Sequence, residues 1–183
     1  MGTKIEIDTD ILKELITLSN IEVEEPLSET TIYDGLIKAG KMGDFIKKGA
    51  ASNSNNILVI DDIGVVTYQL KVMLKNVGYD VQIAKDIFSG LNTFIKANYA
   101  FVIMDLFVST EQEGFALLKE TKKIITKNNL DTKIIVITAS SKSENKVKCM
   151  NGGADIFLKK DTGWQSKLLE IIEEMHPMQD KFL

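Results

Sequence analysis

The sequence contains no arginine, and lysine supplies all 22 of its basic side chains, against 26 Asp and Glu. It has one cysteine, so no disulfide can form within the chain, and we expect a reducing compartment. The single histidine, His176, excludes a site built from several histidines and leaves little for Ser-His-Asp or Cys-His catalysis. The longest apolar run, Tyr99 to Met104, is far too short to span a membrane. Because charged residues also interrupt the first twenty positions, we expect a cytoplasmic protein without a membrane partner.

The negative charge of the chain lies at one end. Residues 1–50 hold 6 Lys against 10 Asp and Glu, which accounts for the whole net charge of −4, and the remaining residues are neutral in sum. Nucleic-acid binding draws on clustered basic residues interleaved with aromatic ones, and we find no such cluster. Nucleic acid is therefore not an expected partner.

What is present is the composition of a globular protein. The 183 residues are 44% hydrophobic and 26% charged, enough to build a core for one domain with a modest extension. Residues 51–56 form a polar stretch without apolar periodicity, which reads as a linker. We therefore divide the chain into an N-terminal segment at 1–50, a linker at 51–56 and a second domain at 57–178.

Short apolar runs and helical periods alternate through the second domain. We expect strands at 57–60, 81–84, 100–104, 134–137 and 156–158. Helical spacing follows each of them, at 66–77, 86–95, 115–125, 143–151 and 164–172. Continuous apolar strands favour a parallel sheet buried on both faces, so the predicted fold is α/β, a doubly wound five-stranded sheet with helices on both faces.

Polar residues follow the predicted strands, where open α/β sheets bind their ligands. Asp61 and Asp62 follow the first strand, Asp105 the third, Thr138 the fourth, and Lys159 and Lys160 the fifth. Singly, each has an ordinary explanation as a cap, a β-former or a solvated lysine. Together they favour Mg²⁺, held by carboxylates, and a carboxylate that attacks a phosphoryl group to form an aspartyl phosphate.

At this point the sequence resembles the receiver domain of two-component response regulators, over residues 56–176. The resemblance rests on five stretches: ILVIDD at 57–62, FVIMDLF at 101–107, EGFALLKE at 113–120, IIVITAS at 134–140 and GGADIFLKKD at 152–161. It implies a flavodoxin-like receiver fold that takes a phosphoryl group from a histidine kinase or phosphotransfer protein.

The resemblance also implies roles for individual residues. The phosphoacceptor would be Asp105, with Thr138 as the switch hydroxyl. The aromatic switch position would be Phe157, which makes Lys160 the family lysine and Lys159 its solvated neighbour. The Mg²⁺ ligands would be Asp61, Asp62, Asp105 and the backbone carbonyl of Phe107, with Asp62 the more direct of the acidic pair. Phe107 and Ser140 stand where the family tunes phosphoryl lifetime, and we expect slow loss, because neither side chain is suited to orient a water.

The sequence departs from the family pattern in three places. Asp161 replaces the proline that usually follows the lysine, and adds a negative charge near Lys160. Ser109 replaces a second proline, and the loop at 108–113 is one residue longer than usual. These changes leave the five key residues intact but bear on loop geometry, partner choice and phosphorylation rate.

The N-terminal segment has a less definite pattern. Ile11, Leu15 and Leu18 mark one amphipathic helix, and 32–46 a second that several glycines weaken. Fifty residues form a marginal core alone, so we expect this segment to pack on the receiver, on its own copy in a homodimer, or on a partner. Ile5 and Ile7 alternate with charged residues, which is typical of a short strand. The resulting strand–helix–helix order also fits a ribbon-helix-helix DNA binder, but the net charge of the segment opposes that assignment.

Three functions remain open. The leading hypothesis is a phosphoacceptor signalling protein that switches a protein–protein contact, with an output partner that the sequence does not name. The alternative is a phosphorylation-independent pseudo-receiver that serves as an interaction module. A third candidate is a phosphatase or another hydrolase with an aspartate nucleophile. Such an enzyme commonly has a second Asp two residues after the nucleophile, where this chain has Phe107.

Overall fold

The structure is a computed structural model, and it describes residues 54–177. The predictions for residues 1–50, including the amphipathic helices and the homodimer contact, lie outside the described residues, as do positions 51–53 of the linker. The domain boundaries therefore stay predictions.

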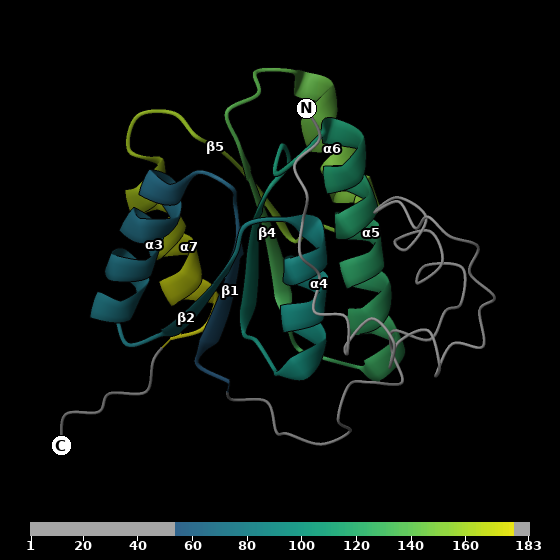
Figure 1. Ribbon diagram of the computed structural model, residues 1–183. Coiled ribbons are helices and arrows are strands. Elements are labelled where there is room, and N and C mark those ends of the chain that lie inside the picture. Colours follow the sequence, from purple (N-terminus) through teal and green to yellow (C-terminus); the bar gives the residue numbers. More distant parts are fainter. Residues whose placement is uncertain (1–53, 178–183) are drawn as a thin grey trace, which may run out of the picture. The chain divides into compact units, whose positions relative to one another are not determined.

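Five parallel strands form one sheet in the middle of the described part (Figure 1). Their order across the sheet is β2-β1-β3-β4-β5. The strand β2 therefore lies on one side of β1, and β3, β4 and β5 lie on the other side. All five predicted strands are confirmed, each end within one residue of its predicted position. The strands are β1 (Asn56–Ile60), β2 (Asp80–Ala84), β3 (Phe101–Asp105), β4 (Lys133–Thr138) and β5 (Ile156–Lys159).

A helix follows each strand, and the helices cover both faces of the sheet. Figure 1 shows α3 and α7 on one face and α4, α5 and α6 on the other. This arrangement confirms the doubly wound fold. The helices are α3 (Gly64–Asn76), α4 (Ile87–Lys96), α5 (Glu111–Asn128), α6 (Ser143–Gly152) and α7 (Trp164–Met175).

The strands supply the centre of the core. Ile57, Leu58 and Val59 of β1 are fully buried, as are Val102 and Ile103 of β3, because neighbours in the sheet and helices on both faces surround them. Burying an aliphatic side chain of this size contributes about 1.5–3 kcal/mol relative to leaving it in water. The continuous apolar runs in the sequence thus reflect a sheet that has no solvent-exposed face.

Local polar contacts fix where the helices begin and end. Asp86 caps α4, since its Oδ1 accepts a hydrogen bond of 2.8 Å from the backbone N–H of Ser89. After α6, Gly153 adopts a φ of 104°, in the left-handed region that glycine favours. A cap that we did not predict begins α5, where Thr110 Oγ1 accepts from the N–H of Glu113 at 3.2 Å. The caps at Asp86 and Thr110 end the loops that follow the carboxyl ends of β2 and β3, whereas Gly153 begins the loop that leads to the amino end of β5.

The buried face of α5 differs from the predicted one. The apolar spacing predicts a helical period of Phe115, Leu118, Lys122 and Ile125, with Leu117 and Ile124 beside it. Four of these six residues are buried, whereas Phe115 and Lys122 are only half-buried. The buried positions are Gly114, Leu117, Leu118, Glu120, Thr121, Ile124 and Ile125. The helix is rotated toward Gly114 because this residue packs on the carbonyl of Leu106, where any Cβ would overlap the backbone oxygen.

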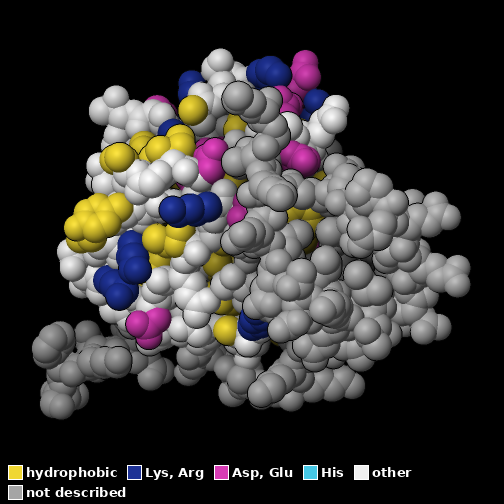
Figure 2. Space-filling view, in the orientation of Figure 1, with side chains coloured by type: hydrophobic (Ala, Val, Ile, Leu, Met, Phe, Trp, Pro, Cys, Tyr) yellow, Lys and Arg dark blue, Asp and Glu magenta, His cyan; other side chains and the backbone are white. Residues whose placement is uncertain are grey.

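One helix leaves apolar side chains exposed. Figure 2 shows hydrophobic side chains gathered over α3, and the exposed ones in and just before this helix are Ile63, Val65, Tyr68 and Val72. Patches of this kind commonly mark surfaces that contact another protein. None of the helices within residues 54–177 combines the length and the apolar character needed to cross a bilayer.

Candidate functional site

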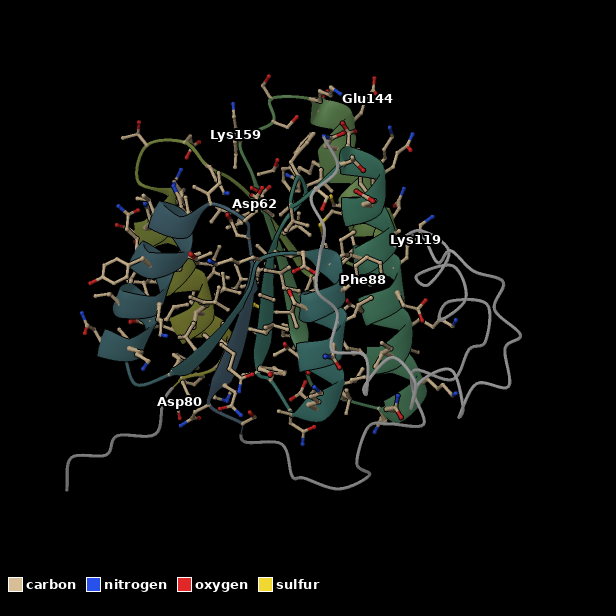
Figure 3. The ribbon with its side chains drawn as sticks, in the orientation of Figure 1. Asp62, Asp80, Phe88, Lys119, Glu144 and Lys159 are labelled. Carbon is tan, nitrogen blue, oxygen red and sulfur yellow. The ribbon has the colours of Figure 1, made fainter. Side chains whose placement is uncertain are left out.

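The carboxyl ends of four strands meet at one edge of the sheet. Asp61 directly follows β1, Asp105 ends β3, Thr138 ends β4, and Lys160 directly follows β5. The register places Asp105 opposite Ile137 of β4, one residue before Thr138. The same edge lies uppermost in Figure 3, where Asp62 is labelled. These four residues, which the sequence placed at the ends of predicted strands, therefore lie together at the same edge of the sheet.

Lys160 joins two carboxylates at this edge. Its Nζ donates to Asp61 Oδ2 at 2.8 Å and to Asp105 Oδ2 at 2.6 Å. The three side chains are each less than a tenth exposed. Burial lowers the pKa of Lys160, but hydrogen bonds to Asp105 and Asp61, together with their negative charges, outweigh it and raise the pKa above its ordinary value. The lysine is therefore an ammonium that lies between the two carboxyl groups.

Backbone amides hold the other oxygen of each carboxylate. The N–H of Ile63 donates to Asp61 Oδ1 at 2.8 Å, and the N–H of Phe107 donates to Asp105 Oδ1 at 3.0 Å. Each bond spans two residues, so the turn that follows the strand orients the side chain at its end. Both carboxylates are fixed before any ligand arrives, and each oxygen keeps a lone pair beyond the bond that it accepts.

Thr138 is fully buried at the end of β4. Its Oγ1 accepts a hydrogen bond of 3.1 Å from the backbone N–H of Ser140, and its carbonyl accepts one of 2.8 Å from the N–H of Lys160. The hydroxyl proton of Thr138 is thus not used in either bond. The Oγ of Ser140 accepts from the N–H of Lys142 at 3.3 Å, at the start of α6.

The remaining predicted site residues lie farther out. Asp62 is exposed, and no partner for its carboxylate is found within residues 54–177. The ring of Phe107 is 38% exposed, although its backbone contacts Asp105. Phe157 is half-buried on β5, paired in register with Val136. The structure thus gathers Asp61, Asp105 and Lys160 tightly. Asp62 and Phe107 follow the two aspartates in the chain, and Phe157 lies on β5, three residues before Lys160.

The oxygen-rich edge has the donor chemistry of a magnesium site. Carboxylates and a carbonyl are the ligands that Mg²⁺ prefers, usually completed by water. Over the described range, however, no three acidic, His or Cys side chains are grouped closely enough to hold a metal ion. The ammonium of Lys160 joins Asp61 to Asp105, and Asp62 lies exposed beside them. The donor set therefore fits the cation in type, with Asp62 as its outermost carboxylate.

Among the described residues, the carboxylate of Asp161 is paired with Lys167 and not with Lys160. Its Oδ1 lies 3.4 Å from the Nζ of Lys167, in the first turn of α7, and both side chains are about half exposed. Lys159 is exposed, and Figure 3 shows it extending outward from the edge of the sheet. Asp161 stands where the family usually has a proline, and its negative charge is paired with a lysine of α7. Lys160 therefore keeps its bonds to the two buried carboxylates.

One buried polar residue near this edge was not predicted. Asn145 of α6 is fully buried, and its Nδ2 donates to Ser140 Oγ at 3.3 Å. A sequence signal for its burial exists, since Asn145 precedes Cys149 by four residues and so shares its side of a helix.

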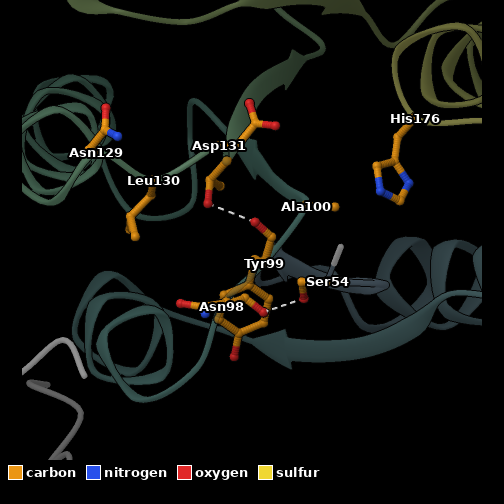
Figure 4. A pocket seen from close by; sticks show the side chains of 9 residues that line it. Ser54, Asn98, Tyr99, Ala100, Asn129, Leu130, Asp131 and His176 are labelled. Carbon is orange, nitrogen blue, oxygen red and sulfur yellow. Dashed lines mark hydrogen bonds between the residues drawn. The ribbon is translucent and has the colours of Figure 1, made fainter. Parts of the chain in front are cut away.

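A second polar region lies at the opposite edge of the sheet. Figure 4 shows a pocket of about 130 Å³ beside the amino ends of β1 and β3. Its hydrogen bonds tie loops together: Ser54 Oγ donates to the carbonyl of Asn98 at 2.6 Å, and Thr132 Oγ1 donates to that of Tyr99 at 2.7 Å. The pocket is lined by Ser54, Asn98, Tyr99, Ala100, Asn129, Leu130, Asp131, Thr132 and His176. It shares no residue with the edge that holds Asp105.

Comparisons of this chain with a family model and with curated proteins point to the same family. The family model described as response regulator receiver domain matches residues 57–173. The transcriptional regulatory protein DltR of Streptococcus agalactiae is 29% identical over 104 residues, and SrrA of Staphylococcus aureus is 26% identical over 107. These matches cover 57% and 58% of this chain, but only 44% and 42% of the relatives. Since both relatives are named as transcriptional regulators, the comparisons do not support our expectation that nucleic acid is not a partner.

Solved structures agree on the fold. A CheY-like receiver domain protein from Methanospirillum hungatei is 27% identical, with a TM-score of 0.58, over 67% of this chain and 94% of that one. A response regulator from Burkholderia pseudomallei is 26% identical, with a TM-score of 0.56, over 67% of this chain and 72% of that one. The latter contains a phosphorylated aspartic acid, a calcium ion and citrate.

Proposed function

Because the chain belongs to the response regulator receiver domain family, we propose that it is a signalling protein whose Asp105 accepts a phosphoryl group from a phosphohistidine donor. Receiver domains are signalling proteins rather than enzymes that turn over a small substrate. The observation that carries the proposal is the buried trio, in which Lys160 Nζ is bonded to both Asp61 and Asp105 at the ligand-binding edge of the sheet.

The proposed chemistry is one displacement at phosphorus. A carboxylate oxygen of Asp105 forms the new P–O bond, the P–N bond of the donor breaks, and the released imidazole takes up a proton. The ammonium of Lys160 offsets negative charge on the phosphoryl oxygens, and the free hydroxyl proton of Thr138 can be donated to one of them. Because the backbone already holds Asp105 Oδ1, little reorganisation of the carboxylate is needed.

We propose that Mg²⁺ is held by Asp62, Asp105 and the backbone carbonyl of Phe107, with Asp61 at its side. Bound there, the cation would supply positive charge for the phosphoryl oxygens. The support is the donor type and the exposed, unpartnered carboxylate of Asp62 among the described residues. Asp62→Ala should lower the Mg²⁺ affinity at least tenfold in calorimetric titration, because a charged ligand is lost. An equal affinity in this variant would remove Asp62 from the site.

Two features support phosphorylation of an aspartate and a protein contact as the output. The response regulator from Burkholderia pseudomallei, which is 26% identical to this chain, contains a phosphorylated aspartic acid. Phosphorylation of an aspartate therefore occurs in a protein similar to this one. The exposed apolar side chains of α3, such as Val65 and Tyr68, form a surface suited to another protein. We propose a histidine kinase or phosphotransfer protein as the donor, and Phe157 as part of the switch.

The proposal is tested by intact-mass analysis after incubation with acetyl phosphate and Mg²⁺. A gain of one phosphoryl group that is absent in Asp105→Asn supports the phosphoacceptor. Asp80→Asn is a suitable control, since Asp80 begins β2 at the far edge of the sheet. No gain at saturating donor would favour the pseudo-receiver, in which the fold persists without the switch.

A further inference from the structure

Helix α6 has the fewest buried residues of the five described helices. Only Asn145 and Cys149 are buried in it, whereas α5 buries seven residues. Val147 and Met150 of α6 are exposed, so its apolar side chains contribute little to the core. A helix held by so few contacts depends strongly on each of them. One of its two buried side chains is polar, and this polar side chain faces the loop that follows Thr138.

Two hydrogen bonds link Asn145 to the proposed site. The Nδ2 of Asn145 donates to Ser140 Oγ at 3.3 Å, and the N–H of Ser140 donates to Thr138 Oγ1 at 3.1 Å. The second bond uses a lone pair of the Thr138 hydroxyl and thereby orients its proton. The position of Ser140 therefore controls the direction in which Thr138 can donate, and Asn145 holds Ser140 by its side chain.

Stability of the fold does not account for Asn145. Its Oδ1 is buried and has no hydrogen-bond partner within residues 54–177. Because the amide makes a single side-chain contact, either orientation of the group leaves one of its two end atoms unpaired. An apolar side chain of similar shape would avoid this cost. What the amide adds at this position is the bond to Ser140.

We infer that Asn145 is a positioning residue for phosphoryl transfer, which acts through Ser140 to hold the Thr138 hydroxyl toward the phosphoryl group. The inference rests on the proposed function of Asp105. Loss of this one neutral hydrogen bond should lower the maximal rate of phosphorylation about fivefold, the equivalent of about 1 kcal/mol of barrier. The concentration of donor needed for half the maximal rate should stay the same, because Asn145 does not contact the donor.

The test compares Asn145→Leu with Cys149→Ala, using acetyl phosphate and Mg²⁺. Both variants alter a buried anchor of α6, but only the first removes the link to Ser140. Asn145→Ala, which adds no bulk, is the second variant if the leucine disturbs folding. We expect the fivefold loss in either Asn145 variant and less than a twofold change in Cys149→Ala. Equal losses would show that Asn145 acts only by anchoring the helix, and would overturn the inference.

A double variant tests the route. Ser140→Ala should cost the same rate as Asn145→Leu, and the two together should cost no more than either alone. Additive losses would contradict an action through Ser140. Amide hydrogen exchange of the Ser140 N–H, measured without phosphate, separates the inference from the proposed function. If the wild type takes no phosphoryl group, the proposed function fails. Even then, faster exchange of the Ser140 N–H in Asn145→Leu than in Cys149→Ala would show that Asn145 positions Ser140. Unchanged exchange decides against it.

Discussion

Replacing Lys160 by methionine tests the charge balance at the edge of the sheet. Methionine matches the unbranched stem of lysine in length but lacks the terminal ammonium, which lies 2.8 Å from Asp61 and 2.6 Å from Asp105. The two carboxylates would then stay buried together without a counter-charge. Removing one partner from a buried ion pair typically costs about 3–5 kcal/mol, because it leaves an uncompensated charge.

The structure places the expected cost near the lower end of that range. Each carboxylate keeps its bond from a backbone amide, from Ile63 to Asp61 and from Phe107 to Asp105. A hydrogen bond to a charged group is worth about 1.5–3 kcal/mol, so these bonds still stabilise the ionised form. We therefore expect Lys160→Met to lower the free energy of unfolding by about 3 kcal/mol.

Urea denaturation in EDTA measures this difference without interference from a divalent cation. Lys159→Met is the matched control, since the neighbouring lysine is exposed and should cost no more than about 0.5 kcal/mol. In an Asp105→Asn background, Lys160→Met should cost less than in the wild type, because only one carboxylate is then left unpaired. Equal losses for Lys160→Met and Lys159→Met would refute the reasoning.

Three further predictions concern other positions. Gly114→Ala should lower the free energy of unfolding by more than about 2 kcal/mol, because the added Cβ would overlap the carbonyl oxygen of Leu106. Gly64→Ala is the control, since a Cβ at that position meets open space, and equal urea midpoints for the two variants would contradict the prediction. Burial raises the pKa of Cys149 to about 11 from 9.0, so its contribution to stability is full below pH 9 and is lost as the pH rises toward 11. Its alkylation by iodoacetamide at pH 8 should therefore require unfolding, and rapid labelling of the native protein would disprove it. Phe107→Asn should shorten the lifetime of the phosphoryl group several-fold, because an amide can orient water, and equal or slower decay of the phosphorylated mass would reject this role.

The main site residues could be predicted because a parallel sheet collects the ends of its strands. Once the apolar runs were recognised as strands, Asp61, Asp105, Thr138 and Lys160 had to lie at one edge. The choice of Lys160 over Lys159 needed the family resemblance, since both follow β5. The structure gives the physical difference, because Lys160 reaches two buried carboxylates while Lys159 is exposed.

Contacts that depend on the exact rotation of a helix could not be predicted. The pairing of Asp161 with Lys167 requires the first turn of α7 to begin three residues after Asp161, which a sequence pattern does not specify. The burial of Gly114 depends on a close approach to Leu106, which the apolar spacing of α5 did not indicate. Asn145 was missed because a polar residue in a short helix is usually solvated.

The central claim is that the phosphoryl group is attached to Asp105 and to no other carboxylate at the edge of the sheet. Reduction with borohydride converts an aspartyl phosphate to homoserine, and peptide mass analysis then locates the modified residue. After incubation with acetyl phosphate and Mg²⁺, homoserine should be found at position 105 alone, and it should be absent when EDTA replaces Mg²⁺. Homoserine at position 61 or 62, or none at any position in the presence of Mg²⁺, would contradict the assignment.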